Sequence, residues 1–298
     1  TISWPCPWLV QRMQIYLELS KWRVTCLMLI TVWVGMTLAS STPVAWQLSF
    51  FTLLGIGLIA SAAGALNHLL ERHLDSQMAR TERRPLPQGK ISSLHVLLFS
   101  ITAGLSGLSL LSLFTNPLTG FLSLISLIGY AFFYTLYLKH HTPQNIVIGG
   151  LSGAMPPALG WAAIADAVPA EAWLLVLIIF IWTPPHFWAL ALYRTNDYAR
   201  AGLPMLPVTH GQQFTRLHIL LYAILLFIVT LLPYLTGMSS LIYLASAIIL
   251  GGGFIYFALL MMRKKDDKTA MKTFGFSIMY LMVLFTALLL DHYVPVRF

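Results

Sequence analysis

Three oxygen-bearing side chains recur at one-turn spacing near residue 70. Asn67, Glu71 and Asp75 stand at positions i, i+4 and i+8, so a helix that continued through them would project all three from one face. Hard oxygen donors of this kind suit Mg²⁺, which is commonly shared between one or two carboxylates and the phosphates of a substrate. The spacing therefore predicts a magnesium site on this segment.

Basic residues follow this stripe of oxygen donors at once. Arg80, Arg83 and Arg84 come shortly after Asp75, and a guanidinium can clamp phosphate oxygens through two parallel hydrogen bonds. The alternative is a solvated helix end whose acids pair with its own arginines. We favour the functional interpretation because the stripe emerges directly from an apolar helix, where ionisable groups are usually functional.

The composition places these residues in a membrane protein. Of 298 residues, 58% are hydrophobic and only 9% are charged, whereas soluble chains are near a quarter charged. The net charge of +8 is spread over short segments between apolar runs rather than over one soluble face, so it indicates membrane topology rather than nucleic-acid binding. We expect an all-α integral membrane protein that is embedded in the lipid bilayer and binds no nucleic acid.

Apolar stretches long enough to cross a bilayer number about nine, since a spanning helix needs about 20 residues. They cover residues 24–40, 46–66, 94–114, 118–138, 146–165, 173–192, 217–236, 241–261 and 274–290. Nine spans of about 20 residues, joined by short loops, account for most of the chain. We therefore expect one polytopic domain over residues 1–298. Two connectors, 67–93 and 193–216, are long and rich in ionisable groups, and we expect the chemistry there.

The basic residues predict the orientation of the chain. Arg12, Lys21 and Arg23 precede the first span, and residues 41–45 after it carry no basic group, so the N-terminus should be cytoplasmic. With nine spans, every later basic connector falls on the same side, and the C-terminus should be periplasmic. The start of the chain lacks the pattern of a transit peptide, which favours the inner membrane of a bacterium.

The motifs around these residues resemble those of the UbiA superfamily of membrane prenyltransferases. Its first signature is N-x-x-x-D-x-x-x-D, and the run through Met78, Arg80-Thr81 and Arg84-Pro85 looks like the protoheme IX farnesyltransferase branch. Residues 134–150, 153–161, 182–190 and 197–208 are similar to further motifs of that branch. The resemblance covers about residues 63–208 and implies a UbiA-type helical fold.

The resemblance also implies an activity, which is transfer of a farnesyl group from farnesyl diphosphate to a vinyl group of heme B, giving heme O. The implied Mg²⁺ ligands are Asn67, Glu71, Asp75 and Asp197, and the implied phosphate-binding cations are Arg80, Arg84, Arg194 and Lys139. All of these except Arg194 form the predicted catalytic set. Further substrate contacts are assigned to Thr81, Arg83, Asn145, His186 and Tyr198. The implied protein partners are a heme A synthase or a terminal oxidase.

The sequence departs from the family pattern at two places. Glu71 stands where the family usually has Asp, and His73 stands where a further Asp is common. Glu can still bind a metal through its longer arm. Asp197 is followed four residues later by Ala201, so the second signature lacks the D-x-x-x-D of other superfamily members, a loss typical of the heme branch.

Two residues and the overall function keep alternative interpretations. Lys139 is either a phosphate ligand or a topology marker at the end of a span. His186 either contacts heme iron or a propionate, or it is satisfied by a backbone carbonyl that Pro184-Pro185 frees. The rival functions are a prenyltransferase for an aromatic or quinone precursor and a transporter. Asp and Glu are absent from the middle of every proposed span, which argues against transport.

Overall fold

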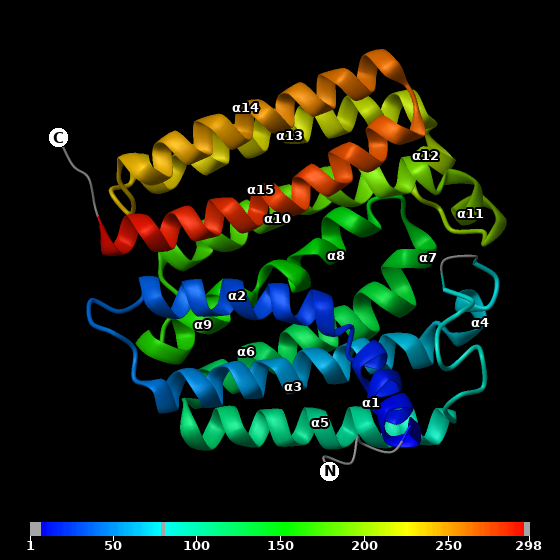
Figure 1. The fold of residues 1–298 in the computed structure, drawn as a ribbon, viewed down its shortest axis with the longest axis horizontal. Helices are drawn as coiled ribbons and strands as arrows, with labels where there is room; N and C mark the ends of the chain where they lie inside the picture. The colour runs from blue at the N-terminus through cyan, green and yellow to red at the C-terminus, as the bar shows by residue number, and fades with distance from the viewer. Residues whose placement is uncertain (1–6, 79–80, 295–298) are drawn as a thin grey trace, which may run out of the picture.

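The computed structural model describes residues 7–78 and 81–294, and within these ranges the chain is helical with no strand (Figure 1). The long helices are α2 (Trp22–Leu38), α3 (Trp46–Leu70), α5 (Ser93–Phe114), α10 (Ala170–Tyr193), α13 (Gln212–Leu235), α14 (Leu241–Lys264) and α15 (Asp267–Tyr293). Two other stretches are composite, namely α6 (Pro117–Ile128) with the π-helix η1 (Gly129–Leu138) and α7 (Lys139–His141), and α8 (Asn145–Ala154) with α9 (Pro156–Ala165). The predicted all-α fold class is confirmed.

Eight helical stretches in the described ranges are long and apolar enough to cross a membrane. The first predicted span falls in α2, which has 17 residues and joins α1 (Pro7–Leu19) at a bend of 58°. Counting this broken pair as one span brings the number in the described part of the chain to nine. The chain is therefore a multi-pass membrane protein, while its single domain stays a prediction.

The short helices gather at one end of the bundle, on the right in Figure 1. They are α4 (Arg72–Asp75), α7, α11 (Thr195–Arg200) and α12 (Leu206–Thr209). Both long connectors that are rich in ionisable groups lie at this end, one after α3 and one after α10. The topology thus brings together the two segments that the sequence marks for chemistry.

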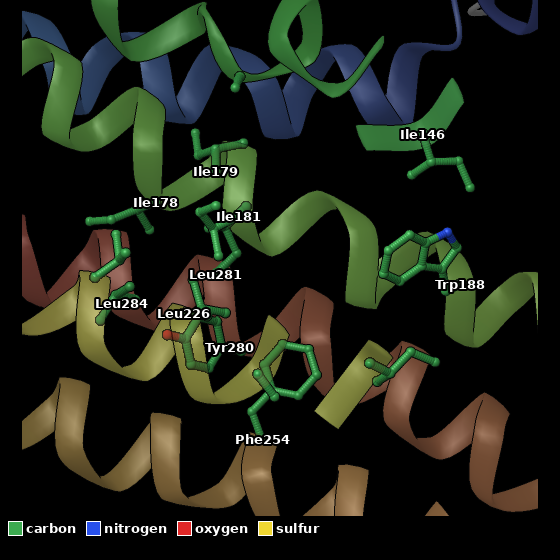
Figure 2. Packing of buried hydrophobic residues seen from close by; sticks show 14 of the residues in the cluster. Ile146, Ile178, Ile179, Ile181, Trp188, Leu226, Phe254, Tyr280, Leu281 and Leu284 are labelled. Atoms are coloured by element: carbon green, nitrogen blue, oxygen red, sulfur yellow. The ribbon is translucent and has the colours of Figure 1, made fainter. Parts of the chain in front are cut away.

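The largest apolar core lies around α10, and Figure 2 shows part of it. Ile181 of α10 belongs to one buried cluster with Leu281 and Tyr280 of α15 and Phe254 of α14. These helices are apolar on nearly all sides because one side meets other helices and the other side meets lipid. The packing fixes α10, whose C-terminal end leads into the second ionisable connector.

Helices α2 and α9 approach each other backbone to backbone. A Cβ atom on Gly160 would lie 2.0 Å from the carbonyl oxygen of Val32, and one on Gly35 would lie 2.0 Å from the carbonyl oxygen of Pro157. Small residues let transmembrane helices come this close. Both positions therefore require glycine for reasons of space.

Gly160→Ala should lower the melting temperature in detergent, because the new methyl group has to push α2 and α9 apart. Overpacking of this kind typically costs about 1–3 kcal/mol. Gly153→Ala is the matched control, since a Cβ there meets nothing within 4 Å and Ala favours a helix over Gly. A melting temperature for Gly160→Ala at or above that of Gly153→Ala would contradict the close approach.

Candidate active site

The stripe of oxygen donors lies where α3 gives way to α4. Glu71 caps α3 with φ −93° and ψ 6°, so the helix does not continue unbroken through the stripe. The Glu71 N–H still donates to the Asn67 carbonyl at 3.0 Å, and the Asp75 N–H donates to the Glu71 carbonyl at 2.8 Å. The one-turn spacing therefore survives the break. Asn67, Glu71 and Asp75 are 3%, 6% and 2% exposed, so all three side chains are buried within the bundle.

Each carboxylate of the stripe is held by a basic side chain. Lys139 Nζ lies 2.6 Å from Glu71 Oε1, and both side chains are buried. Arg84 Nη1 lies 2.6 Å from Asp75 Oδ2. The structure thus brings four of the predicted site residues together in two ion pairs. One pair joins the end of α3 to α7, and the other joins α4 to the connector that follows it.

Asn67 is held by a cation as well, and this cation is one that sequence reasoning missed. Lys21 Nζ donates to Asn67 Oδ1 at 2.6 Å and to the Tyr130 hydroxyl at 3.0 Å. The Thr135 hydroxyl donates to the Tyr130 carbonyl and is left to accept from Asn67 Nδ2 at 3.2 Å, which fixes the amide orientation. Lys21 was interpreted as a topology marker only, and no local spacing links it to Asn67.

The electrostatics of Glu71 reflect these neighbours. Burial raises the pKa of the Glu71 carboxyl, but Lys139, Lys21 and Arg84 more than offset that effect, so the pKa lies below its ordinary value. The ion pair with Lys139 therefore contributes to stability at neutral pH. That contribution is lost as the pH falls from the ordinary pKa of a glutamate through the lower pKa that Glu71 has in the folded state.

A second cluster surrounds Asp197 in α11. Arg200 Nη2 lies 2.5 Å from Asp197 Oδ1, and Arg194 Nη1 lies 3.2 Å from Asp197 Oδ2. Hydrogen bonds from Arg200 and Arg194 lower the pKa of the Asp197 carboxyl and outweigh its partial burial. Tyr198 beside it is buried. Asp197 thus carries a stable negative charge at the same end of the bundle as the first cluster (Figure 1).

The other predicted residues differ in their surroundings. Thr81 is buried and its hydroxyl donates to the Asp75 carbonyl at 3.0 Å, whereas Arg83 is exposed and Arg80 lies outside the described residues. Asn145 is buried, and its Nδ2 donates to the Thr142 carbonyl at 2.7 Å. Its Oδ1 is buried and meets no hydrogen-bond partner among the described residues, and a contact with substrate stays a prediction.

His186 lies in an aromatic cage between α10 and α15. Its ring stacks between Trp182 at 4.2 Å and Phe274 at 4.5 Å between ring centroids. Its Nδ1 pairs with the Ser277 hydroxyl at 2.6 Å. The expectation that a freed backbone carbonyl satisfies this histidine is wrong at Nδ1, because a hydroxyl from α15 lies within reach. A contact with heme stays a prediction.

The donor set fits magnesium in its chemistry. Asn67, Glu71 and Asp75 offer buried amide and carboxylate oxygens, which are the ligands that Mg²⁺ prefers. Within the described ranges, no three Asp, Glu, His or Cys side chains form a group that could hold a metal ion. A magnesium ion bound here would therefore need ligands other than Asp, Glu, His and Cys side chains, such as the Asn67 amide and the oxygens of a phosphate.

The fold is an apolar helical bundle, and one end carries buried carboxylates beside lysine and arginine side chains of the kind that bind phosphate. This combination defines a class of membrane enzymes. The chain belongs to the UbiA prenyltransferase family, whose family model matches residues 28–286. Two relatives are called protoheme IX farnesyltransferase, one from Burkholderia ambifaria (strain MC40-6) and one from Burkholderia pseudomallei (strain 668). Each is 55% identical over 282 residues, which cover 95% of this chain and 94% of the relative.

Solved structures show the same fold. A structure concerned with digeranylgeranylglyceryl phosphate synthase matches with a TM-score of 0.78 and 20% identity, over 95% of this chain and 99% of the other. A UbiA homolog from Archaeoglobus fulgidus bound to GPP and Mg²⁺ matches with a TM-score of 0.62 and 16% identity, over 92% of this chain and 99% of the other. At these identities the likeness shows the fold alone, and it confirms the predicted UbiA-type bundle.

Proposed function

We propose that the chain is a heme O synthase, which transfers a farnesyl group from farnesyl diphosphate to a vinyl group of heme B. The observation that carries the proposal is the buried Asn67–Glu71–Asp75 stripe with its cations at the loop end of an apolar bundle. The identity of the acceptor is supported by the relatives called protoheme IX farnesyltransferase.

The first task of the site is to stabilise the leaving diphosphate. As the allylic C–O bond breaks, both of its electrons go to the diphosphate oxygen, and negative charge builds there. Lys139 and Arg84 each lie 2.6 Å from a carboxylate of the stripe and would donate hydrogen bonds to the phosphate oxygens. Arg194 would do the same from the junction of α10 and α11, since it lies beside Asp197 at the same end.

Magnesium is the implied cofactor of this step. Asn67, Glu71 and Asp75 would hold it, with Asp197 as the predicted ligand from the second cluster, and when bound the ion supplies further positive charge to the leaving oxygens. The UbiA homolog from Archaeoglobus fulgidus was solved with GPP and Mg²⁺, which supports a metal-assisted reaction.

The second task is to keep water from the allylic cation until the vinyl carbon reaches it. The vinyl π electrons form the new C–C bond, which leaves a cation on the porphyrin side, and water then adds there and releases a proton to give the hydroxyethyl group. An apolar bundle interior delays the competing attack by water on the farnesyl cation. Both substrates have a long apolar part and a polar end, which suits a site where apolar helices meet charged connectors.

The direct test is heme analysis. The purified chain in detergent, supplied with heme B, farnesyl diphosphate and Mg²⁺, should yield heme O and diphosphate, measured by chromatography with mass detection. Unchanged heme B together with prenylation of an aromatic acid or quinone precursor would replace the proposal with the rival prenyltransferase activity. We further propose that a heme A synthase or a terminal oxidase receives the product.

Arg84→Ala should raise the KM for farnesyl diphosphate far more than the KM for heme B, because it removes a charge-assisted phosphate contact worth about 1.5–3 kcal/mol, or roughly tenfold to a hundredfold. Arg80→Ala should act in the same way. Lys90→Ala is the control, since Lys90 is an exposed lysine of the same connector. Normal activity of both arginine variants at limiting farnesyl diphosphate would refute the arginine clamp.

The proposed orientation in the inner membrane places the N-terminus and the basic residues 263–272 in the cytoplasm, with the C-terminus in the periplasm. Phe298 itself lies outside the described residues. Reporter fusions at both ends should report opposite sides of the membrane. Fusions that place both termini on one side would refute the nine-span arrangement.

A further inference from the structure

Three cations of the chain occupy the oxygen donors of the stripe. Lys21 holds Asn67 Oδ1, Lys139 holds Glu71 Oε1 and Arg84 holds Asp75 Oδ2, each at 2.6 Å. Three positive side chains thus lie against one amide and two carboxylates. The carboxylates therefore have their negative charge balanced by the protein itself.

These cations would repel a metal ion that bound to the stripe. A divalent ion placed beside Glu71 and Asp75 would lie near three positive groups, and the repulsion from a single ammonium about 5 Å away weakens its binding by roughly tenfold even at the dielectric constant of water. A diphosphate removes this conflict, because its oxygens accept hydrogen bonds from ammonium and guanidinium groups and bind Mg²⁺ at the same time.

We propose that Mg²⁺ and the prenyl diphosphate bind this chain only as a coupled pair, with Lys21, Lys139 and Arg84 passing from the stripe to the phosphate oxygens as the pair enters. The inference rests on the proposed function and adds two points to it. It assigns a positioning role to Lys21, and it predicts strongly positive cooperativity between the metal and the diphosphate.

The backbone around Lys21 supports its role as more than a topology marker. Lys21 lies at the 58° bend between α1 and α2, with φ 49° and ψ 42°, a left-handed conformation that costs a residue other than glycine roughly 1 kcal/mol or more. Such strain persists where the surroundings hold it. Here the contacts to Asn67 and Tyr130 tie the bend to α3 and η1.

The test uses calorimetry on the purified full chain, with Mg²⁺ and farnesyl thiolodiphosphate, an unreactive analogue, as probes. Mg²⁺ alone should bind at least a hundredfold more weakly than Mg²⁺ in the presence of the analogue, after correction for the complex that the two form in solution. By linkage, Mg²⁺ should raise the affinity for the analogue by the same factor. Equal affinity for Mg²⁺ with and without the analogue would overturn the inference and leave the proposed function standing.

A charge-removing variant tests the inference by the sign of its effects. Lys21→Met should raise the affinity for Mg²⁺ alone by about tenfold, because it removes one competing charge, and should lower the affinity for the analogue. Arg84→Met should shift both affinities in the same directions. Arg23→Met is the matched control, since Arg23 is an exposed cation two residues further on and should change neither affinity by more than about twofold.

The possible outcomes separate the two proposals. If Lys21→Met and Arg84→Met leave Mg²⁺ binding unchanged or weaken it while both proteins melt like the parent chain, the cations do not compete with the metal and the inference fails. If the parent chain binds no analogue even with Mg²⁺ present, the diphosphate site itself is wrong and the proposed function fails with it.

Discussion

Asp75→Asn should lower heme O formation by about a hundredfold or more while leaving the protein folded. The change keeps the size of the side chain and much of its hydrogen bonding, but it removes the negative charge that would hold Mg²⁺. A metal ion contributes several kcal/mol of charge stabilisation in the transition state, and each 1.4 kcal/mol is a factor of ten. Glu71→Gln should behave alike, because Glu71 occupies the adjacent turn of the same stripe.

The measurement is turnover of heme B and farnesyl diphosphate across a Mg²⁺ titration, with a melting curve in detergent beside it. Asp166→Asn is the matched control, since Asp166 is an exposed acid in a left-handed position that Asn tolerates well. Near-normal turnover of Asp75→Asn at low Mg²⁺ would show that Asp75 only pairs with Arg84. In that case the loss should fall on the melting temperature instead, because the pair is largely buried and breaking a buried ion pair is destabilising.

Lys139→Met should be the most destabilising single change at the site. It leaves the buried Glu71 carboxylate without its cation, and breaking a buried ion pair by removing one partner typically costs about 3–5 kcal/mol. The double variant Glu71→Gln/Lys139→Met should regain most of the lost melting temperature, because neither partner then carries an unpaired charge. Both variants should remain inactive in heme O formation.

This comparison separates structure from function at one ion pair. A pair that served stability alone would let the double variant recover activity together with its melting temperature. A catalytic pair predicts recovery of stability only. A double variant that melts as low as Lys139→Met would contradict the ion pair itself.

The sequence predicted the parts of this fold that depend on local pattern. Apolar stretches of spanning length define the helices because the bilayer leaves few other solutions, and the length and ionisable content of two connectors indicated where the site lies. The spacing of Asn67, Glu71 and Asp75 indicated one shared face, although the helix breaks at Glu71. Whether these residues bind Mg²⁺ stays a prediction.

The parts that depend on contacts between distant segments were not predictable. Lys21 reaches Asn67 across 46 positions, and His186 reaches Ser277 across 91, so no helical or strand period connects either pair. Lys21 also shares its place before the first span with Arg12 and Arg23. Its position at the bend between α1 and α2 and its contacts to Asn67 and Tyr130 distinguish it from them.

The wide turns of η1 give the hydrogen-bonding pattern of the fourth span an unexpected meaning. A π-helix closes its hydrogen bonds over five residues instead of four. Tyr130, which contacts Lys21, lies near the start of η1, and Lys139, which contacts Glu71, follows its end. The same residues wound as an ordinary α-helix, at about 100° a residue, would still cross the bilayer, but they would turn further, so Lys139 would leave the span in another direction. The winding of this span therefore sets the aim of the site as well as the path across the membrane.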